Sequence, residues 1–546
     1  MEDIGAEDIL SRSMNQRSTL LLTSLGVGVY LALVLLSDNW GVGKLDAPPG
    51  QSARESGLED SWPYLIEDTY DRYAYLKRGR WLASGGTPYL QEFSEYPQLT
   101  TWMMGLPYLF LEHEVPQGEP YGTVERAREF LVEQGLELKR VDEGLAAMAR
   151  GPASPEDVLA GQQGPLAAPL GALREALGGD PNVLGPARDH LVAVATALTA
   201  WKDEGAALAK GYGDVHHVLM ALWFLLLLLL LSKGLALRDA RPEWLLLLLA
   251  PGYLYFGFNR FDLPITVLVT AAVLLQLRER RLAAHAVLGV AFAVKWYPIV
   301  LVPLFLSEGL HAARRRAAAR GESWAWIAGL RRHVLVPGLC TLGVILLFLA
   351  ASYAQGGMEA VTAPFRWHLL SERIRWHPNV REPNHAALAS LMTSPESWDW
   401  FSFELRESIG RVFLVLSLGL PCLLALLPLG DRRAFLHAVV FATTGMIVCA
   451  KFFSPQWVLW VAALGLLAAP GLRGYGPWLV ALGVVIYLQL PLSYYHAQVA
   501  TPDGDFLADP FFRLATAARV ALLVGLWLAS LIASLICVRR SMARAG

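Results

Sequence analysis

The sequence predicts an all-α polytopic membrane protein. Hydrophobic residues make up 54% of its 546 residues, and the mean hydropathy is +0.38. Runs such as 19–36 and 217–231 are long and apolar enough to cross about 30 Å of hydrocarbon. Short basic clusters separate the apolar runs, as they do in cytoplasmic loops. These observations favour a bundle of roughly 10–12 transmembrane helices with large extracytoplasmic loops.

The overall charge and the cysteines narrow the class of protein. A net charge of −2 argues against nucleic acid as a partner. The N-terminus is acidic and lacks a small-residue cleavage site, so we expect the first span to be a retained anchor. Four cysteines lie within apolar runs without ligand spacing: Cys340, Cys422, Cys449 and Cys537. They predict small core residues, with neither a disulfide framework nor a metal site, and we expect no cofactor.

The basic clusters also predict the topology. They occur at 232–241, 278–281, 313–320 with Arg331 and Arg332, 431–433, Arg473 and 538–544. With all of them placed inside, the spans alternate over 214–233, 243–257, 263–279, 334–352, 410–428, 434–450, 455–470, 476–494 and 514–537. The stretch 283–309 is predicted to be an up-and-down pair of short helices. Its hinge lies at 295–298, because proline cannot continue a helix.

The segment 96–111 is predicted not to cross the membrane. It has only about 16 residues and contains two prolines, and a full crossing would place the cluster 232–241 outside, against the charge rule. We therefore expect it to dip into the interface. This leaves two outer regions, 38–213 and 353–409.

Five parts follow from this topology. They are 1–112 (first transmembrane helix, outer catalytic loop and interfacial segment), 113–213 (helical extracytoplasmic insertion), 214–352 (transmembrane core), 353–409 (outer loop) and 410–546 (C-terminal transmembrane helices). Apolar residues at three-to-four spacing predict helices within the insertion, and Pro/Gly clusters separate them. We expect a helical hairpin or small bundle that covers the membrane site.

An acidic group begins the first outer loop. Glu67, Asp68 and Asp71 lie close together in the sequence, among tyrosines. Acidic loop ends are common near membranes, so a solvated loop is one interpretation. The other is a carboxylate at the bilayer surface that deprotonates an incoming hydroxyl. A single base is enough when a lipid phosphate is the leaving group, unlike the paired carboxylates of a glycoside hydrolase.

Charged residues also occur at membrane level. Asn259, Arg260 and Asp262 lie at the outer end of a predicted hairpin, and Lys295 lies inside an apolar run. Such residues are costly in a membrane and are functional candidates. One alternative is an ion pair that stabilises packing, between Arg260 and Asp262 or between Lys295 and a neighbour. The other is that Lys295 or Arg260 binds a phosphate at headgroup level.

The late outer loop is strongly basic, which is unusual for an outer loop. Between 365 and 392 it carries His368, Arg373 and His385 among other arginines and histidines, interleaved with tryptophans. This pattern suits a sugar phosphate, although a Trp/Arg belt touching anionic lipid is the alternative. The histidines lack tight metal spacing, so no metal is expected. Lys451 and Gln456 add polar groups on the same face.

Several short motifs occur in a familiar order. They are Asp71, Tyr75, Gly85, Pro88-Tyr89 and Glu95-Tyr96-Pro97, then Asn259 with Asp262, then Lys295, Tyr297 and Pro298, then the His/Arg-rich loop, and finally Ser454-Pro455-Gln456-Trp457. This order resembles the C-type (GT-C) polyprenol-phosphate-sugar glycosyltransferases, particularly glycosyltransferase family 87. The chain departs from that pattern at Gln98, where a second proline is usual, in the spacing from 368 onward, and in the insertion 113–213.

The resemblance implies a GT-C fold and a transfer of a hexose, often mannose, with inversion. The donor would be a polyprenyl-phosphate-sugar and the acceptor an extracytoplasmic hydroxyl on a glycan or glycolipid. It implies Asp71 as the base, with Asp68 as the alternative. The expected phosphate-binding residues are Arg260, Lys295, His368, Arg373, His385 and Lys451, and the expected substrate-binding residues are Tyr75, Tyr89, Glu95, Asn259, Asp262 and Gln456.

The expected location is the inner (plasma) membrane, with membrane lipids around the chain and the active site facing outward. Two other functions stay open. One is a secondary transporter or lipid flippase, although the matched broken helices of such proteins are not evident in the sequence. The other is a catalytically inactive scaffold with the same fold.

Overall fold

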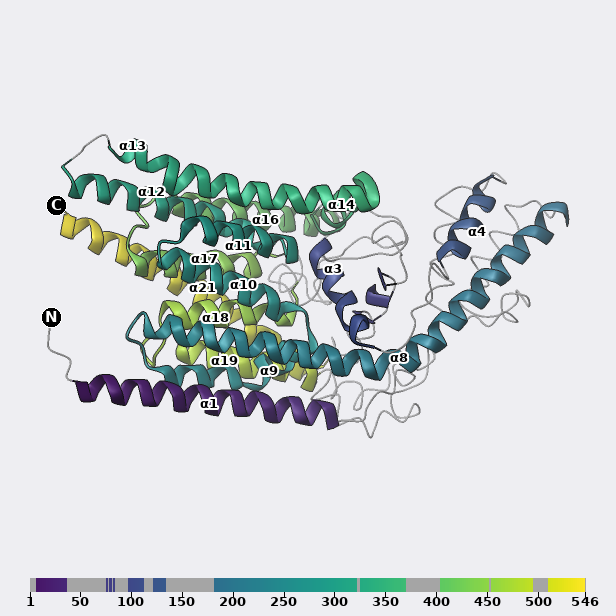
Figure 1. Ribbon diagram of the computed structural model, residues 1–546, viewed down its shortest axis with the longest axis horizontal. Coiled ribbons are helices and arrows are strands. Elements are labelled where there is room, and N and C mark those ends of the chain that lie inside the picture. The colour runs from purple at the N-terminus through teal and green to yellow at the C-terminus, as the bar shows by residue number, and fades with distance from the viewer. Residues whose placement is uncertain are drawn as a thin grey trace. The chain divides into compact units, whose positions relative to one another are not determined.

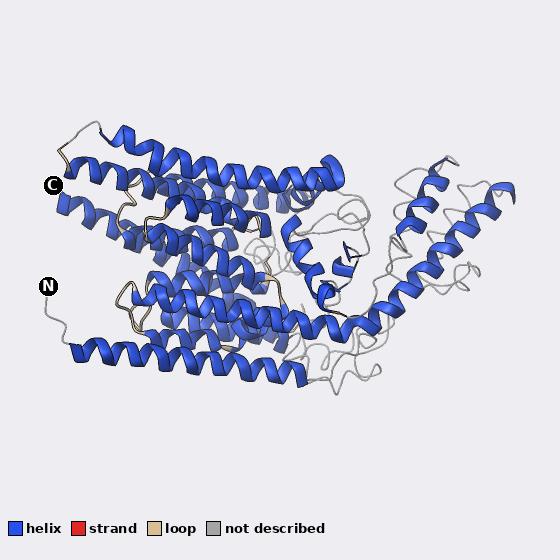
Figure 2. Cartoon of the chain, in the orientation of Figure 1, coloured by secondary structure: helices blue, strands red, loops and turns tan. Residues whose placement is uncertain are grey.

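The protein is helical throughout the part of the chain that the structure describes. This computed structural model describes residues 6–36, 75–76, 78–80, 82–83, 97–111, 121–133, 181–321, 325–369, 403–450, 453–493 and 509–545 (Figures 1 and 2). Within these ranges the regular elements are helices, with no strand. The predicted all-α class is confirmed for these residues.

The helices follow one another with short connections in the apolar part of the chain. In order they are α1 (Ala6–Leu36), α3 (Gln98–Gly105), η4 (Leu106–Phe110), α4 (Tyr121–Glu133), α8 (Pro181–Ala236), η5 (Pro242–Leu249), α9 (Pro251–Asn259), α10 (Asp262–Leu277), α11 (Arg281–Val294), η6 (Tyr297–Leu301), α12 (Val302–Ala319), α13 (Ala325–Leu330), η7 (Arg331–Leu335), α14 (Val336–Leu369), α16 (Phe403–Ala425), α17 (Arg432–Val448), η9 (Pro455–Trp457), α18 (Val458–Ala468), α19 (Gly476–Tyr487), η10 (Leu488–Leu492) and α21 (Pro510–Ala545).

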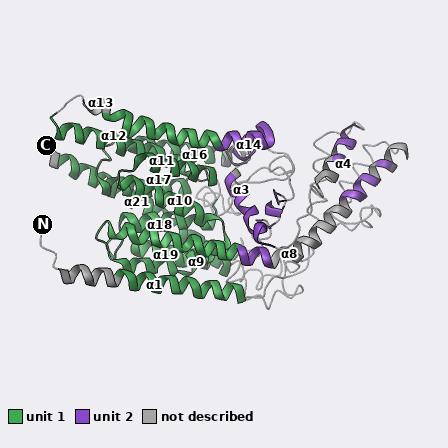
Figure 3. Ribbon diagram, in the orientation of Figure 1, with its two compact units in different colours: residues 1–71, 216–347, 382–546 green, residues 72–215, 348–381 purple. Residues whose placement is uncertain are grey.

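The chain divides into two compact units (Figure 3). Unit 1 comprises Met1–Asp71, His216–Leu347 and Glu382–Gly546, and unit 2 comprises Arg72–Val215 and Phe348–Arg381. The predicted boundary between insertion and core, at 213/214, falls inside α8, which is one continuous helix in the structure.

Five helical segments are long and apolar enough to cross a membrane. They are Gln16–Leu36, Gly211–Ala236, Arg331–Arg366, Ser408–Ala425 and Pro510–Ala543. A sixth is counted if α9 and α10, bent by 106° at their break, form one span. Three shorter apolar helices lie at Arg281–Val294, Pro455–Ala468 and Gly476–Leu492. The protein therefore has the helices of a membrane protein, while the count of roughly 10–12 spans stays a prediction.

The basic clusters of unit 1 lie at one end of its helices (Figure 1). The Arg238 guanidinium, just after α8, donates hydrogen bonds to the carbonyls of Leu467 and Ala468 at the end of α18. Near the start of α1, the Gln16 amide donates to the Ser232 hydroxyl over 2.8 Å. We call this the basic end. The charge pattern predicts that it faces the cytoplasm.

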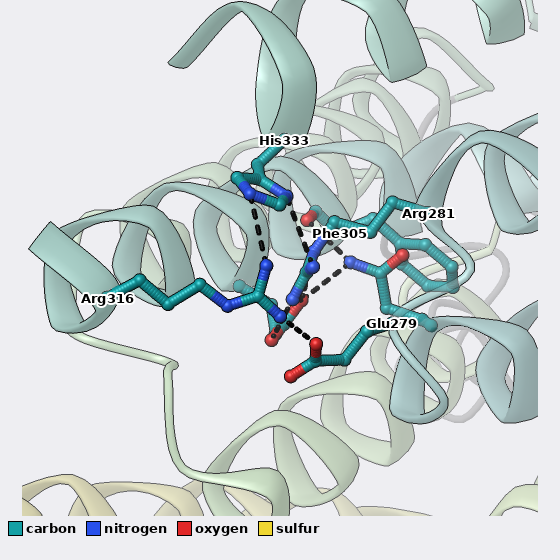
Figure 4. A network of polar contacts seen from close by, with 7 residues as sticks. Glu279, Arg281, Phe305, Arg316 and His333 are labelled. Carbon is teal, nitrogen blue, oxygen red and sulfur yellow. Dashed lines mark hydrogen bonds and ion pairs between the residues drawn. The ribbon is translucent and has the colours of Figure 1, made fainter. Parts of the chain in front are cut away.

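A buried ion pair joins three segments at the basic end (Figure 4). Arg281 begins α11, and its guanidinium donates to both carboxylate oxygens of Glu308 in α12 over 3.0 and 3.1 Å. The Gln276 amide donates to the same carboxylate over 2.8 Å. A carboxylate shared by a guanidinium fork and an amide is well satisfied, as a buried charge must be. The pair therefore fixes the turn between α10 and α11 against α12.

His333 extends this network into the π-helical turn η7. Its Nδ1 lies 3.3 Å from Arg281 Nη1, and its Nε2 lies 3.2 Å from Arg316 Nη1. A neutral imidazole has one acceptor nitrogen, so it accepts a hydrogen bond from only one of these arginines at a time. Arg316 also pairs with the exposed Glu279, and this outer pair is screened by solvent.

In unit 2, residues of the predicted catalytic loop pack against α3 and η4. The Tyr108 hydroxyl donates to the Leu76 carbonyl over 2.9 Å, and burial raises the pKa of the Tyr108 phenol, so the donor keeps its proton. Gly79 lies so close to α3 that a Cβ there would be 2.0 Å from the Met104 carbonyl oxygen. Only glycine allows this approach. The thirteen residues of α3 and η4 form two short helices; their position at the membrane interface stays a prediction.

Candidate functional site

The candidate site lies at the end of α10 opposite to the basic end. α10 begins at Asp262, where the partial positive charge of a helix N-terminus favours a carboxylate. α11 ends at Val294, and Lys295 follows in extended conformation ahead of Pro298. The Lys295 ammonium donates to both oxygens of Asp262, over 2.8 and 3.0 Å. The Asp262 side chain is 1% exposed and the Lys295 side chain 16% exposed, so the cation forms the accessible side of the pair.

Two tryptophans also lie beside this pair. The Trp460 indole donates to Asp262 Oδ1 over 3.0 Å. The Lys295 ammonium lies 5.3 Å from the Trp460 ring centre and 5.9 Å from that of Trp457. These distances fall within the range of cation–π attraction. The ammonium is thus held by one carboxylate and two aromatic faces, which fixes its position more tightly than a flexible lysine alone allows.

The aromatic side chains continue as a row. Tyr297 stacks on Trp460 with ring centres 3.9 Å apart and an angle of 10°. Trp460 lies 5.3 Å from Trp457 at 22°, and Phe453 meets Trp457 edge-on at 6.2 Å. We call Tyr297, Trp460, Trp457 and Phe453 the ring row. Phe453, Trp457 and Trp460 come after α17 in the chain, whereas Tyr297 belongs to η6. The row lies beside the ion pair.

Two polar atoms beside the ring row have no hydrogen-bond partner among the described residues. One is the Gln456 side-chain carbonyl oxygen, and the other is the Tyr297 hydroxyl. Gln456 is 1% exposed and Tyr297 is 3% exposed. Buried polar atoms almost always have a hydrogen-bond partner. Two such atoms without one, both close to the Lys295–Asp262 ion pair, therefore require an explanation.

A fully buried arginine lies at the far end of the ring row. The guanidinium carbon of Arg519 is 3.8 Å from the Phe453 ring centre, and its Nη1 donates to Gln489 Oε1 over 3.0 Å. The Gln489 amide in turn donates to the Thr516 hydroxyl over 2.8 Å. The sequence analysis missed Arg519. A charged residue within the apolar run 514–537 was the signal that would have found it.

The site lies deeper in unit 1 than the N-terminal end of α21. Three contacts show that α21 runs antiparallel to α17: Ser534 with Ala434, Trp527 with Phe441, and Arg519 with Phe453. α21 begins at Pro510, so it extends about 14 Å beyond the level of Arg519. α1 likewise continues past Tyr30, whose ring lies 5.0 Å from Phe258 near the end of α9. The ion pair and the ring row therefore lie deeper in unit 1 than the first residues of α21 and the last residues of α1.

Differences in helix length explain why the site lies deeper than the end of α21. α11 has 14 residues and α18 has 11, which at about 1.5 Å per residue gives about 21 and 17 Å. Both are shorter than a hydrocarbon layer of about 30 Å, whereas α21 has 36 residues. Helices that start near one end of unit 1 thus stop at different heights at the other.

The structure brings part of the predicted site together. Asn259, Arg260 and Asp262 lie at the break between α9 and α10, and Asp262 contacts Lys295. Of the pairings that the sequence left open, that of Lys295 with a neighbour is present. The Asn259 amide donates to the Tyr255 carbonyl in its own helix over 2.8 Å. Its side chain is therefore used in local packing.

The other predicted residues fall elsewhere. Tyr75 is buried in unit 2, and the backbone of His368 belongs to the last turn of α14. Seven predicted residues lie outside the described residues: Asp68, Asp71, Tyr89, Glu95, Arg373, His385 and Lys451. Their roles stay predictions.

Comparison with protein-family models, with curated proteins and with solved structures finds no match to this chain. The resemblance to glycosyltransferase family 87 therefore depends on the motifs quoted above.

Proposed function

We propose that the protein is a membrane glycosyltransferase. It would transfer a hexose, with mannose as the first candidate, from a polyprenyl-phosphate-sugar to an extracytoplasmic acceptor hydroxyl. The observation that supports this most is the Lys295 ammonium, fixed by Asp262 beside the ring row. A fixed cation suits a lipid phosphate, and aromatic side chains next to it suit the C–H groups of a sugar ring.

The proposed reaction is a single displacement. The acceptor hydroxyl oxygen attacks the anomeric carbon while a carboxylate, Asp71 by the resemblance, takes the hydroxyl proton. The bond between the anomeric carbon and the phosphate oxygen breaks, and the polyprenyl phosphate leaves with the electron pair. Attack opposite to the leaving group inverts the anomeric configuration.

Lys295 would lower the barrier by stabilising the leaving phosphate. Negative charge grows on the phosphate oxygen as the bond breaks, and a cation already in place needs little reorganisation. Asp262 is the positioning residue, because it holds the ammonium through both carboxylate oxygens. The neighbouring tryptophans limit the water around the ammonium, which strengthens its attraction to an anion.

Neutralising Lys295 is expected to lower the transfer rate strongly. Lys295→Gln leaves the Asp262 carboxylate buried without its ammonium and destabilises the fold, so Lys295→Gln/Asp262→Asn serves as the main variant. We expect kcat/KM for polyprenyl-phosphate-mannose to fall about 10- to 100-fold, the effect of losing a charge-assisted hydrogen bond. The measurement is transfer of labelled mannose by purified protein in liposomes.

Lys233→Gln is the matched control, because Lys233 is an exposed lysine at the basic end. Its kcat/KM should equal that of the wild type. A double variant that unfolds at the wild-type temperature and keeps the wild-type rate would remove Lys295 from phosphate binding. A wild-type protein that binds the donor without turnover would support the inactive scaffold.

One observation favours the second candidate, a transporter or lipid flippase. α9 and α10 meet at 106° around a two-residue break, and broken helices near a binding site are typical of transporters. The same liposomes separate the two functions. Movement of labelled polyprenyl-phosphate-mannose between leaflets without any transfer of label would replace the proposed reaction with transport.

A further inference from the structure

Tyr297 and Gln456 each bury one polar atom that has no hydrogen-bond partner among the described residues, close to the ion pair. Tyr297 lies two residues after Lys295 and its ring covers Trp460, which binds Asp262. Gln456 precedes Trp457, whose ring lies below the Lys295 ammonium. Residues from two separate chain segments thus place one hydroxyl and one carbonyl oxygen along the same row of rings.

Leaving these atoms unpaired has a cost. A buried donor or acceptor without a partner costs about 1–3 kcal/mol, and neither atom has a partner among the described residues. Other tyrosines of the same unit do bond: the Tyr253 hydroxyl, equally buried, donates to the Leu479 carbonyl over 2.6 Å. The unmade hydrogen bonds of Tyr297 and Gln456 are therefore available to a polar ligand or to ordered water.

We infer that the Tyr297 hydroxyl and the Gln456 carbonyl oxygen bind hydroxyl groups of the transferred sugar and select it. This inference rests on the proposed function and adds the sugar-recognition residues to it. The sugar lies beside the ring row, while its hydroxyls donate to Gln456 and accept from or donate to Tyr297. Lys295 then binds the phosphate next to the anomeric carbon.

Such a site discriminates between sugars by hydrogen bonding. A pocket built to bond a substrate hydroxyl rejects an analogue that lacks it, because the buried protein atom is left unpaired again. A purely apolar site discriminates much less. The substrate class is therefore a pyranose with hydroxyls at the positions that face Tyr297 and Gln456.

The test is Tyr297→Phe, which removes one oxygen and leaves the ring. Because the hydroxyl is unpaired, the thermal unfolding temperature should stay equal or rise. In contrast, kcat/KM for polyprenyl-phosphate-mannose should fall about 3- to 10-fold, the effect of one lost hydrogen bond. Gln456→Met, which keeps the side-chain length, should act in the same direction. Tyr253→Phe is the matched control and should lower the unfolding temperature without changing kcat/KM.

A sugar-free lipid and a set of deoxy-sugar donors distinguish sugar recognition from a general effect of the substitution on the site. Binding of plain polyprenyl phosphate, which has no sugar, should be the same for Tyr297→Phe and the wild type. With deoxy-mannose donors, one deoxy position should remove the difference between the variant and the wild type, as in a double-mutant cycle.

The results distinguish failure of the proposed function from failure of sugar recognition by Tyr297 and Gln456. If the wild type neither binds nor turns over the sugar-bearing lipid, the proposed function fails and this inference fails with it. If the wild type is active and Tyr297→Phe keeps its kcat/KM on every donor, the proposed function remains. In that case only sugar recognition is overturned, and the two polar atoms bind ordered water.

Discussion

Replacing Asp71 with asparagine is expected to abolish sugar transfer while the protein stays folded and inserted. Asparagine has nearly the same shape as aspartate but cannot accept the proton of the acceptor hydroxyl. Loss of a general base typically costs about 10²–10⁴-fold in rate. The measurement is transfer of labelled mannose from polyprenyl-phosphate-mannose by purified protein in liposomes, with the thermal unfolding temperature recorded in parallel.

Asp68→Asn is the matched control for that experiment. The two acids lie three residues apart, so they share their local charge, and only the base should affect the rate strongly. A large loss in Asp68→Asn with an active Asp71→Asn would exchange their roles. A near-normal rate in both variants would leave the proposed reaction without its base.

Replacing Glu308 with alanine is expected to lower the free energy of unfolding by about 3–5 kcal/mol. The change leaves the Arg281 guanidinium buried without its carboxylate, and breaking one side of a buried pair costs this much. The loss is measurable by chemical denaturation in detergent micelles. The double variant Arg281→Met/Glu308→Leu should recover most of it, because apolar residues of similar volume need no counter-charge.

Glu279→Gln provides the contrast at the same end of the molecule. Glu279 pairs with Arg316 in a largely exposed position, where an ion pair contributes about 0–1 kcal/mol. The unfolding curve of Glu279→Gln should therefore be close to that of the wild type. Equal losses in Glu279→Gln and Glu308→Ala would show that the burial of the inner pair has no special effect.

The helical class followed directly from the sequence, because long apolar runs have few other structures available. The basic clusters were equally informative, since the structure gathers those near Arg238, Arg281 and Arg316 at one end of unit 1. Helix bounds were harder to predict. α8 continues through the predicted boundary at 213/214 although Gly211 and Gly213 lie there, because a glycine weakens a helix by only about 1 kcal/mol when the residues on both sides favour it.

The membrane-level charges were found from their cost alone, but their partners were not. Asp262 and Lys295 are 33 residues apart, and Trp460 is 198 residues from Asp262. No local pattern encodes such contacts, which depend on how α10, α11 and α18 pack. Lys295 was therefore recognised as a candidate while its ion pair stayed one of several alternatives.

The polar atoms of Tyr297 and Gln456 illustrate a second limit. A tyrosine before a proline and a glutamine after one are ordinary in a sequence, and nothing in their spacing says whether a hydroxyl finds a partner. That property becomes visible only when the surrounding side chains are in place. It is the part of the candidate site that sequence reasoning is least able to supply.

The reach of α21 above Arg519 has a consequence for turnover. On the proposed reaction, the spent polyprenyl phosphate is released beside the ring row, and α21 extends about 14 Å beyond the arginine at the far end of that row. It leaves as a dianion drawn to a lysine, through surroundings that hydrate it poorly. On this proposal we expect release of the carrier lipid, as in many enzymes, to be slower than the bond exchange.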